Sequence, residues 1–410
     1  MATVLITLFL TALLAVSPTD EYARIYSVYS PPACIVDTEA PSGYIPVYVS
    51  HYGRHGSRYL ERKSMYEDVA KVFSKAARQH GLTDEGKVLL DGLKEFGNLS
   101  AGYYGQLSEL GAAEQKQLGR RLAARYPSVF SDPARRGVRC VSSVAPRCIM
   151  SMTNFSSELK GAFPDLEFEY LCGEHFQKYI IATDFVDTTR HINAPIVSAD
   201  FRERFDFPAF ASRFFKPSVD VASLVPDTLY FVRTLYCNAV DAACISADPE
   251  VRRHFTESEL KAVADNYDVY LYGNFCNSTT GGHLRLRDAV VLVDDVVTKA
   301  DAALSSGNMA ADIRYGHDSA MMTFLSILGI RGYDVHVHPR EVTGLWTSSA
   351  MMPMAANLQM VFYAKPGAEV LVKVLFNEVE TSIPALGPGP YYRWSELRGY
   401  LASRMKDFSK

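Results

Sequence analysis

Apolar residues along the chain recur in short runs, and each of three such runs leads into a stretch with helical periodicity, the first of them through the segment "HYGRHGSRY" (51–59). "YIPVYVS" (44–50) precedes "LERKSMYEDVAKVFSKAARQHG", and "GVRCVSS" (137–143) precedes "APRCIMSMTNFSSELKGAF". "ADIRYGH" (311–317) precedes the apolar stretch "DSAMMTFLSILG". Strands that alternate with helices are typical of a sheet covered by helices on both faces. We therefore predict an α/β fold with a mainly parallel central sheet and flanking helices.

The middle of the chain has a different pattern. Residues 164–307 consist mostly of amphipathic helical runs, whereas the end of the chain returns to strands. There, "ANLQMVFYA" and "EVLVKVLFN" flank a Lys-Pro-Gly turn signal at 365–367, which predicts a hairpin. We predict an α/β catalytic domain formed by residues 40–163 and 308–410, with a mostly helical cap inserted between them.

The first residues have the composition of a targeting segment. The apolar run from Val4 to Val16 is as long as a signal-peptide core and short for a membrane span. Ala15 and Ser17 fit a small-x-small cleavage pattern. We predict that residues 1–17 are a signal peptide, that the mature chain has no stable membrane span, and that it is exported to the periplasm, the cell surface or the medium. A buried N-terminal helix is the alternative.

Charge and cysteine content exclude two classes of protein. The net charge of the 410 residues is −4, which argues against a nucleic-acid binder, because such a protein shows a basic face. The seven cysteines include no CxxC pair, so a zinc ribbon is not predicted. In an exported chain Cys237 and Cys244 are a candidate disulfide pair, and buried free thiols are the alternative.

Polar side chains gather where each predicted strand meets its helix. Ligands of such sheets bind beyond the carboxyl ends of the strands, so side chains from the three junctions are expected on one rim. They are Arg54, His55 and Arg58 after the first strand, Arg147 after the second, and His317 and Asp318 after the third. Arginine presents a planar fork that matches phosphate oxygens in pairs. Three arginines on one rim therefore indicate a pocket for a tetrahedral dianion.

The other residues on this rim could carry out phosphoryl transfer. An imidazole can attack phosphorus and form a covalent intermediate, which makes His55 the candidate nucleophile. The guanidinium groups would stabilise charge on the transferred phosphoryl oxygens. A carboxylic acid must then protonate the leaving oxygen, and Asp318 is the candidate. For the "RHG" motif by itself, an ordinary basic surface loop is the alternative.

The same motifs resemble the histidine acid phosphatases, a clade of the histidine phosphatase superfamily. The family's RHGxRxP box is matched by "RHGSRYL", its downstream arginine segment by "SSVAPRCIMSMTNF", and its HD box by "YGHDSAMM". "YYGQLSELGAAEQKQLGRRLAARYP" is similar to the family's G-x-L-T-x-x-G segment, with Ser108 where threonine is usual. The C-terminal "LFNE…PYYRWSELRGYL" looks like bacterial relatives of multiple inositol polyphosphate phosphatase. The resemblance covers roughly residues 44–400.

The resemblance implies a phosphoglycerate mutase-like α/β core with a helical cap and an enzyme without a cofactor or metal. It implies a small phosphorylated substrate such as phytate, hydrolysed at acid pH through a phosphohistidine. The roles implied by the matching positions are nucleophile for His55, general acid for Asp318, and phosphate binding for Arg54, Arg58, Arg147 and His317.

One departure from the family pattern bears on the general acid. Inositol polyphosphate phosphatases usually carry His-Ala-Glu where this chain has His317, Asp318 and Ser319. Their glutamate therefore has no counterpart here, and Asp318 would take its role as in the acid phosphatases and many phytases. The alternative is a different substrate class, such as that of a broad-specificity acid phosphatase acting on sugar phosphates or other phosphomonoesters.

Three further cations are candidate substrate contacts. Arg62 and Lys63 follow the first junction directly, and Lys178 lies in the predicted cap. A substrate as dense in phosphate as phytate would need additional positive charge near the reacting group. A solvated helix face is the alternative for these side chains.

Two other functions fit parts of the sequence. A metal-dependent hydrolase could use His51 or the H-x-H of His336 and His338, which are more simply read as structural strand residues. Asp294 and Asp295 lie in a helical run and are most simply a solvated pair. A phosphate-binding module without catalysis is the remaining alternative, although candidates for both the nucleophile and the acid are present.

Overall fold

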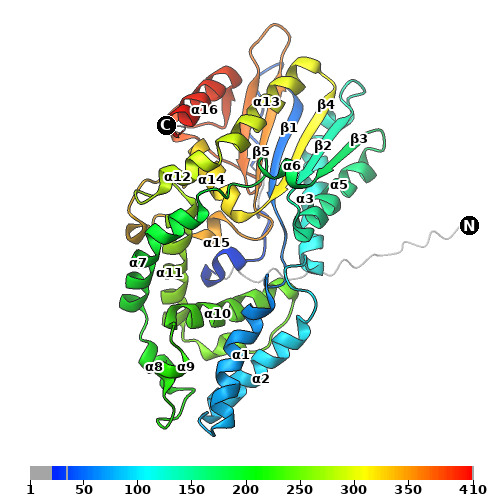
Figure 1. Cartoon of the computed structure of the whole chain (residues 1–410). Coiled ribbons are helices and arrows are strands. Elements are labelled where there is room, and N and C mark those ends of the chain that lie inside the picture. Colours follow the sequence, from blue (N-terminus) through cyan, green and yellow to red (C-terminus); the bar gives the residue numbers. More distant parts are fainter. Residues whose placement is uncertain (1–20, 34–35, 409–410) are drawn as a thin grey trace, which may run out of the picture.

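The centre of the molecule is an eight-stranded sheet, in a computed structural model that describes residues 21–33 and 36–408 (Figure 1). Its strands are β1 (Ile45–Arg54), β2 (Gly137–Ser142), β3 (Glu167–Cys172), β4 (Met309–Gly316), β5 (Asn357–Ala364), β6 (Leu371–Phe376), β7 (Val379–Glu380) and β8 (Tyr391–Arg393). They lie side by side in the order β3-β2-β4-β1-β5-β6-β7, and β8 pairs with β6. The predicted signal peptide, residues 1–17, lies outside the described residues and stays a prediction.

The two halves of the sheet differ in direction. The pairings β1–β4, β4–β2 and β2–β3 are parallel, whereas β5 pairs with β1 and β6 in antiparallel register. The predicted α/β class with a mainly parallel centre is confirmed. The hairpin predicted around residues 365–367 is confirmed as the β5–β6 pair.

The first strand is longer than its predicted range of 44–50. It continues to Arg54, because His51 to Arg54 remain paired with residues 313–316 of β4. Every residue from Val47 to Arg54 is buried. Arg54, the first arginine of the motif, is therefore part of the sheet and not of a loop.

The helices are numbered along the chain as follows: α1 (Lys63–Arg78), α2 (Asp84–Leu99), α3 (Glu109–Arg125), α4 (Pro127–Phe130), α5 (Pro146–Ala162), α6 (Glu174–Gln177), α7 (Val186–Arg204), α8 (Phe207–Ser212), α9 (Val221–Leu224), α10 (Thr228–Asp241), α11 (Glu257–Phe275), α12 (Gly282–Asp288), α13 (Val290–Ser306), α14 (Asp318–Leu328), α15 (Ser348–Met351) and α16 (Trp394–Phe408). Short 3-10 helices are η1 (Glu21–Tyr26), η2 (Ala242–Ile245), η3 (Val251–His254), η4 (Pro339–Glu341) and η5 (Pro384–Leu386).

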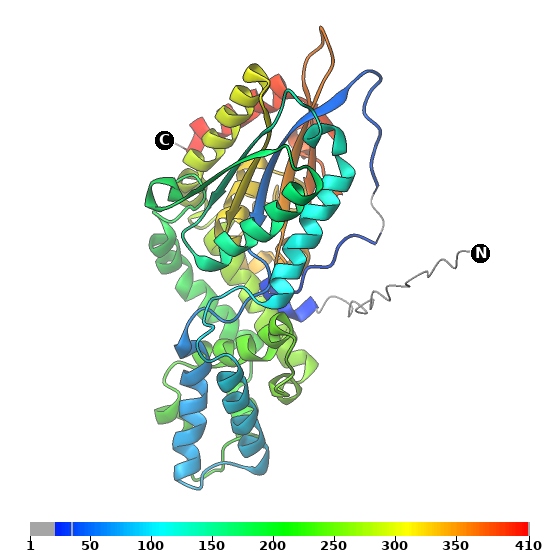
Figure 2. The ribbon, with the colours of Figure 1, turned by 90° about the vertical axis from the view of Figure 1, so that its right-hand side faces the viewer.

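Helices cover both faces of the sheet (Figures 1 and 2). On one face α3 and α5 pack against each other, and α5 packs on β2 and β4. Their core includes Leu118, Leu122, Met152 and Phe155. On the other face α13 and α14 pack on the sheet, and α16 packs on both of these helices. The sheet is thus the middle layer of three, as expected for strands that are apolar on both sides.

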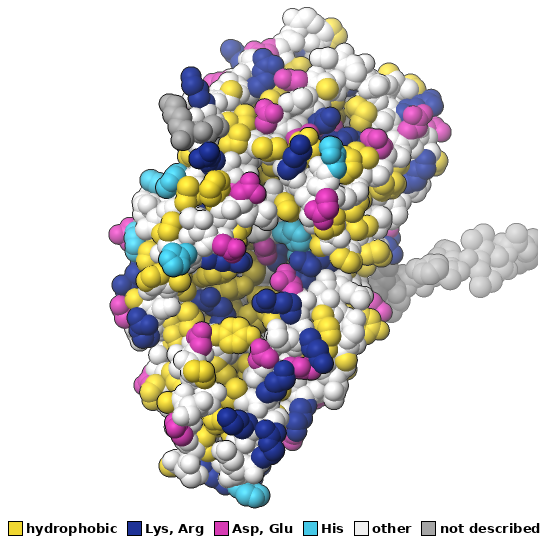
Figure 3. Space-filling view, in the orientation of Figure 1, with side chains coloured by type: hydrophobic (Ala, Val, Ile, Leu, Met, Phe, Trp, Pro, Cys, Tyr) yellow, Lys and Arg dark blue, Asp and Glu magenta, His cyan; other side chains and the backbone are white. Residues whose placement is uncertain are grey.

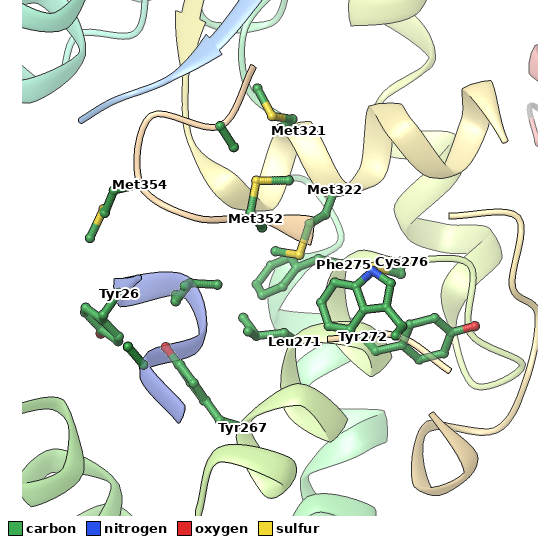
Figure 4. Packing of buried hydrophobic residues seen from close by; sticks show 14 of the residues in the cluster. Tyr26, Tyr267, Leu271, Tyr272, Phe275, Cys276, Met321, Met322, Met352 and Met354 are labelled. Carbon is green, nitrogen blue, oxygen red and sulfur yellow. The ribbon is translucent and has the colours of Figure 1, made fainter. Parts of the chain in front are cut away.

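A second group of helices lies beyond the carboxyl ends of the parallel strands (Figure 1). It meets the sheet layers where α11 packs on α14. Phe275 of α11 lies beside Met322 of α14, with Leu271 on one side of this pair and Met352 on the other (Figure 4). This apolar contact fixes the position of the helical group over the strand ends.

The division of the chain into two domains stays a prediction, and the contacts favour another assignment of some elements. β3 is an edge strand of the sheet and α13 packs on β1 and β4, although both lie inside the predicted cap of residues 164–307. Conversely, α1 packs on α10, although it lies inside the predicted catalytic segment of residues 40–163. We propose that the cap comprises α1, α2 and α7 to α11.

Two expectations about the metal-hydrolase alternative are wrong. His336 and His338 lie in a loop and not in a strand, and His336 contacts the Asn277 carbonyl oxygen at 2.8 Å. Asp295 is buried, because α13 turns it towards the sheet, where Arg314 donates to its carboxylate at 2.8 Å. Within residues 21–33 and 36–408, no group of three His, Cys, Asp or Glu side chains could hold a metal ion.

The candidate disulfide is also wrong, and the alternative of buried thiols holds for this pair. Cys237 and Cys244 are both buried free thiols. Each contacts a different part of one residue: Cys244 Sγ donates to the Tyr26 carbonyl oxygen at 3.1 Å, and the Cys237 thiol forms a hydrogen bond with the Tyr26 side chain.

No helix in the described part of the chain is both long and apolar enough to cross a membrane.

Candidate active site

Side chains from three strand–helix junctions meet at the carboxyl ends of the parallel strands. Arg54 ends β1, Arg147 is the second residue of α5, and Asp318 is the first residue of α14. Arg54 Nη2 donates to Asp318 Oδ2 at 2.8 Å, and Arg147 Nη2 lies 3.4 Å from His317 Nδ1. The predicted convergence of the rim is therefore present in the structure.

His55 is buried in the middle of this group, with its ring in one tautomer. Nδ1 lies 2.9 Å from the Gly56 carbonyl oxygen, which can only accept, so Nδ1 carries the proton and Nε2 keeps its lone pair. The His317 ring lies across it, with 5.7 Å between ring centroids. Burial and the nearby guanidinium groups, Arg147 first among them, hold the pKa of His55 well below its ordinary value of 6.5. The imidazole is thus a neutral base in mildly acid solution.

Arg54 has no exposed surface, and most of its hydrogen-bonding capacity is used inside the protein. Nη1 donates to the carbonyl oxygens of Ile25 and Met352 at 2.7 and 2.8 Å. Its Nε is a buried donor without a partner, and so are Nε of Arg58 and Nε of Arg147 among the described residues. The three guanidinium groups together provide the positive charge that an oxyanion needs.

Asp318 lies at the N-terminus of α14 and is held by two donors. Its Oδ1 accepts from the Ser319 backbone N–H at 2.7 Å, and its Oδ2 accepts from Arg54. Burial by itself would raise the pKa of Asp318, but Arg54 and then His317 outweigh burial and hold the pKa below its ordinary value of 3.8. The helix N-terminus acts in the same direction. The carboxylate is therefore ionised in the resting protein.

His317 is oriented by two neighbours. The Arg147 guanidinium can only donate, so Nδ1 of His317 accepts from it, and Nε2 donates to Ser143 Oγ at 3.0 Å. Burial, and then Arg147, lower the pKa of His317 to about 4. Sequence reasoning did not single out Ser143, although it lies in the quoted "SSVAPR" segment.

The loop after β1 is supported by the start of α3. Glu114 accepts from the Ser57 backbone N–H at 2.7 Å and from Ser57 Oγ at 2.8 Å, and Gln115 donates to the Arg54 carbonyl oxygen at 3.1 Å. Gly56 and Gly111 lie face to face, since a Cβ on Gly56 would come within 2.8 Å of Gly111 Cα. In the sequence this helix stands out only as part of a family segment, and no local pattern indicates its role as a support.

Arg58 is surrounded by two carboxylates and an aromatic ring. Its Nη2 lies 3.7 Å from Glu61 Oε1, its Nη1 lies 3.9 Å from Asp241 Oδ1, and its guanidinium covers the Tyr26 ring at 5.5 Å. Asp241 is fully buried without a hydrogen-bond partner among the described residues, and burial raises its pKa to about 7. Asp241 has no local sequence signal, because it ends an otherwise mostly apolar helix.

A further cation missed in the sequence lies on the cap side. Arg233 of α10 covers the rings of Tyr267 and Tyr270, at 5.3 and 4.9 Å from the two centroids. Those rings are parallel to within 2°, and Tyr267 also stacks with Tyr26 at 6.3 Å. Arg233 Nη2 donates to Asn266 at 2.7 Å. In the described chain Arg233 has no carboxylate partner, so its charge is not offset locally.

The structure does not join the three candidate substrate contacts to this group. Arg62 is exposed and precedes α1, Lys63 pairs with Glu67 at 3.0 Å, and exposed Lys178 lies over the Tyr179 ring at 5.0 Å. Their roles stay predictions. In the space-filling view, Lys, Arg and His side chains lie in and around a hollow between the sheet layers and the helical group (Figure 3).

Comparison with known proteins identifies the fold. No family model matches the chain. By structure, it is similar to multiple inositol polyphosphate phosphatase from Bifidobacterium longum in complex with inositol hexasulfate, with a TM-score of 0.77, 20% identity, and coverage of 93% of this chain and 98% of that one. A phytase from D. castellii gives a TM-score of 0.67, 16% identity, and coverage of 94% and 84%. The fold is therefore the one that these phosphatases share, which confirms the resemblance predicted from the motifs.

By sequence, the chain is similar to one characterised vertebrate protein. It is 24% identical over 300 residues to multiple inositol polyphosphate phosphatase 1 of Gallus gallus. The match covers 67% of this chain and 64% of the chicken protein, so it spans slightly less than two thirds of that relative.

The close approach between the loop after β1 and α3 predicts the effect of a single methyl group. A Cβ on Gly111 would lie 2.7 Å from the Ser57 backbone nitrogen and would force that loop to move. We expect Gly111→Ala to lower the free energy of unfolding in urea by about 1–3 kcal/mol. Gly161 in α5 is the matched control, because its added Cβ meets nothing within 4 Å. Gly161→Ala should stabilise the protein by up to about 1 kcal/mol, and equal effects at the two sites would contradict this packing argument.

Proposed function

We propose that this protein is a phosphomonoester hydrolase that acts through a phosphohistidine intermediate, with inositol polyphosphates as its substrates. The observation that carries the proposal is the neutral imidazole of His55, with a free Nε2, among the guanidinium groups of Arg54, Arg58 and Arg147. We call these three arginines the phosphate clamp. A nucleophile and this clamp in one buried group favour phosphoryl transfer over simple phosphate binding.

The proposed first step transfers the phosphoryl group to His55. Nε2 attacks phosphorus, a P–N bond forms, and the bond between phosphorus and the alcohol oxygen breaks. The arginines stabilise the charge on the three transferred oxygens. Asp318 gives a proton to the leaving oxygen, so the alcohol departs neutral and the aspartate becomes a carboxylate.

The proposed second step returns the enzyme to its starting state. Water attacks the phosphorus of phosphohistidine, and the P–N bond breaks. Asp318, now ionised, takes a proton from that water, and inorganic phosphate is released. Asp318 would thus act first as an acid and then as a base, which microscopic reversibility allows for one carboxyl group.

The proposed substrate class rests on charge at the site and on the relatives. The Bifidobacterium protein was solved with inositol hexasulfate, and the chicken relative is named for inositol polyphosphates. Arg233 supplies a positive charge on the cap side and lies over the Tyr267 ring, which stacks with Tyr26 next to Arg58; we propose that it binds a second phosphate of the substrate. Arg62, Lys63 and Lys178 remain candidate contacts for further phosphates. No cofactor or metal enters the proposed steps.

Export to the periplasm, the cell surface or the medium is part of the proposal. Its support is the apolar run from Val4 to Val16 with the small residues that follow it. Residues soon after this run belong to the site, because the backbone of Ile25 and the ring of Tyr26 contact its arginines.

A direct assay tests the proposed nucleophile. The purified protein should release phosphate from phytate and from an aryl phosphate, with or without a chelator. His55→Ala should lower kcat at least about 10³-fold for both substrates. Wild-type protein quenched during turnover should contain an acid-labile, alkali-stable phosphoryl group that the variant lacks. Full activity of His55→Ala, or loss of activity with the chelator, would contradict the proposal.

A second assay tests the general acid. Inositol hydroxyls are poor leaving groups and need the proton, so Asp318→Asn should lower kcat on phytate by about 10²–10⁴-fold and on an activated aryl phosphate much less. Asp318 is ionised in the resting protein, since Arg54 and His317 outweigh burial and lower its pKa. Wild-type activity on phytate should therefore rise as the pH falls, and the variant should lose this dependence. An equal loss on both substrates would argue against the acid role.

A third assay tests the cap-side cation. Arg233→Ala should raise KM for phytate about tenfold and leave KM for a small aryl phosphate almost unchanged, because only phytate carries further phosphates. Arg393→Ala serves as a comparison, since Arg393 lies on β8, outside the clustered group, and its side chain is 71% exposed. A similar KM change for both substrates in Arg233→Ala would assign Arg233 to the general stability of the cap.

A further inference from the structure

Glu61 lies against two arginines of the site that come from different parts of the chain. Arg147 Nη2 donates to Glu61 Oε1 at 3.1 Å, and Arg58 Nη2 lies 3.7 Å from the same oxygen. Arg58 follows β1, whereas Arg147 lies in the first turn of α5, so this single carboxylate oxygen bridges two junctions. The Glu61 side chain is 45% exposed, and it can therefore move without opening the core.

The surroundings of Glu61 keep it ionised. Arg58 first, and then Arg147 against the opposing effect of burial, hold the pKa of Glu61 below its ordinary value of 4.5. His317 acts in the same direction and Asp318 in the opposite one. Arg58 also lies near Asp241, whose pKa is raised by burial to about 7. In mildly acid solution Asp241 is therefore mostly protonated and uncharged. In mildly acid solution, Glu61 is thus a second carboxylate, besides Asp318, that offsets the charge of the arginines.

Phosphate oxygens and the Glu61 carboxylate need the same donors. A phosphoryl group bound by Arg58 and Arg147 would bring a dianion next to Glu61 Oε1, and like charges at such distances repel. Either Glu61 leaves the two guanidinium groups or it takes up a proton. Both events reduce the net free energy of phosphate binding.

We propose that Glu61 is an internal competitor for the phosphate clamp, which weakens the binding of inorganic phosphate and thereby speeds product release. The inference rests on the proposed function only in its assignment of Arg58 and Arg147 to phosphate binding. The opposite role is a positioning one, in which Glu61 holds both arginines in place and phosphate binding depends on it. The two roles predict opposite effects when the charge of Glu61 is removed.

The experiment is a calorimetric titration of the full chain with inorganic phosphate between pH 4 and 7. We expect Glu61→Gln to bind phosphate about tenfold more tightly than wild type at pH 6, because one negative charge near the ligand is removed. The difference should shrink as the pH falls, because acid protonates Glu61 of the wild type and removes the same charge. Glu67→Gln is the matched control: it removes the same charge six residues along the chain, where Glu67, among the described residues, pairs only with exposed Lys63 and Lys71.

The number of protons taken up when phosphate binds distinguishes competition by Glu61 from a change in packing around it. Wild-type protein should take up protons when phosphate binds, as measured in buffers of different ionisation enthalpy, and Glu61→Gln should take up fewer. Competition also predicts stronger product inhibition by phosphate in Glu61→Gln during turnover. Equal or weaker phosphate binding by Glu61→Gln, in a variant with unchanged thermal stability, would overturn the inference.

The outcomes also distinguish this inference from the proposed function. Tighter phosphate binding by Glu61→Gln in a protein that hydrolyses no phosphomonoester would support the competitor and reject the enzyme. Normal turnover of phosphomonoesters with unchanged phosphate affinity of Glu61→Gln would support the enzyme and reject the competitor. Absence of phosphate binding in wild type and variant alike would overturn both, because the clamp assignment would then be wrong.

Discussion

The buried charge of Arg54 is the constraint on which the site depends. A guanidinium with no exposed surface is tolerated only if its donors are satisfied and its charge is paired. Its partners are the carbonyl oxygens of Ile25 and Met352 and the carboxylate of Asp318. These belong to the N-terminal segment, the loop before β5 and the start of α14. Breaking such a pair costs about 3–5 kcal/mol, so the three segments must assemble together around the end of β1.

The N-terminal segment is consequently part of the site and not an appendage. The Tyr26 ring lies under Arg58, and both thiols once considered for a disulfide, Cys237 and Cys244, contact Tyr26 instead. Tyr26 also stacks with Tyr267 of α11, and Arg233 lies over the same Tyr267 ring. One aromatic row thus connects the arginines at the sheet with the helical group above them.

The sequence predicts two kinds of feature: local secondary structure, and side chains that a general rule of sheet topology brings to one place. The strand–helix junctions placed Arg147 and Asp318 on the same rim as Arg54, because parallel strands end at one edge of a sheet. Contacts between segments that share no pattern could not be found in this way. Asp241 lies 183 positions after Arg58 at the end of a mostly apolar helix, and nothing in its neighbours indicates that it approaches the clamp. The sequence predicts a solvated Asp295 for a related reason, since its partner Arg314 lies on a strand whose facing helix the pattern does not identify.

In the resting protein, the arginines of the site favour the protonation state needed at His55 and oppose the one needed at Asp318. Burial and then the arginines lower the pKa of His55 and favour the neutral form of the proposed nucleophile, but Arg54 also lowers the pKa of Asp318 and keeps the proposed acid ionised. A bound phosphate ester would reverse the second effect, because its negative charge lies next to the carboxylate and makes ionisation less favourable. The ester also occupies guanidinium donors that would otherwise face Asp318. In the proposed reaction, the substrate therefore helps to create the acid that its own leaving group requires, and low pH supplies the proton.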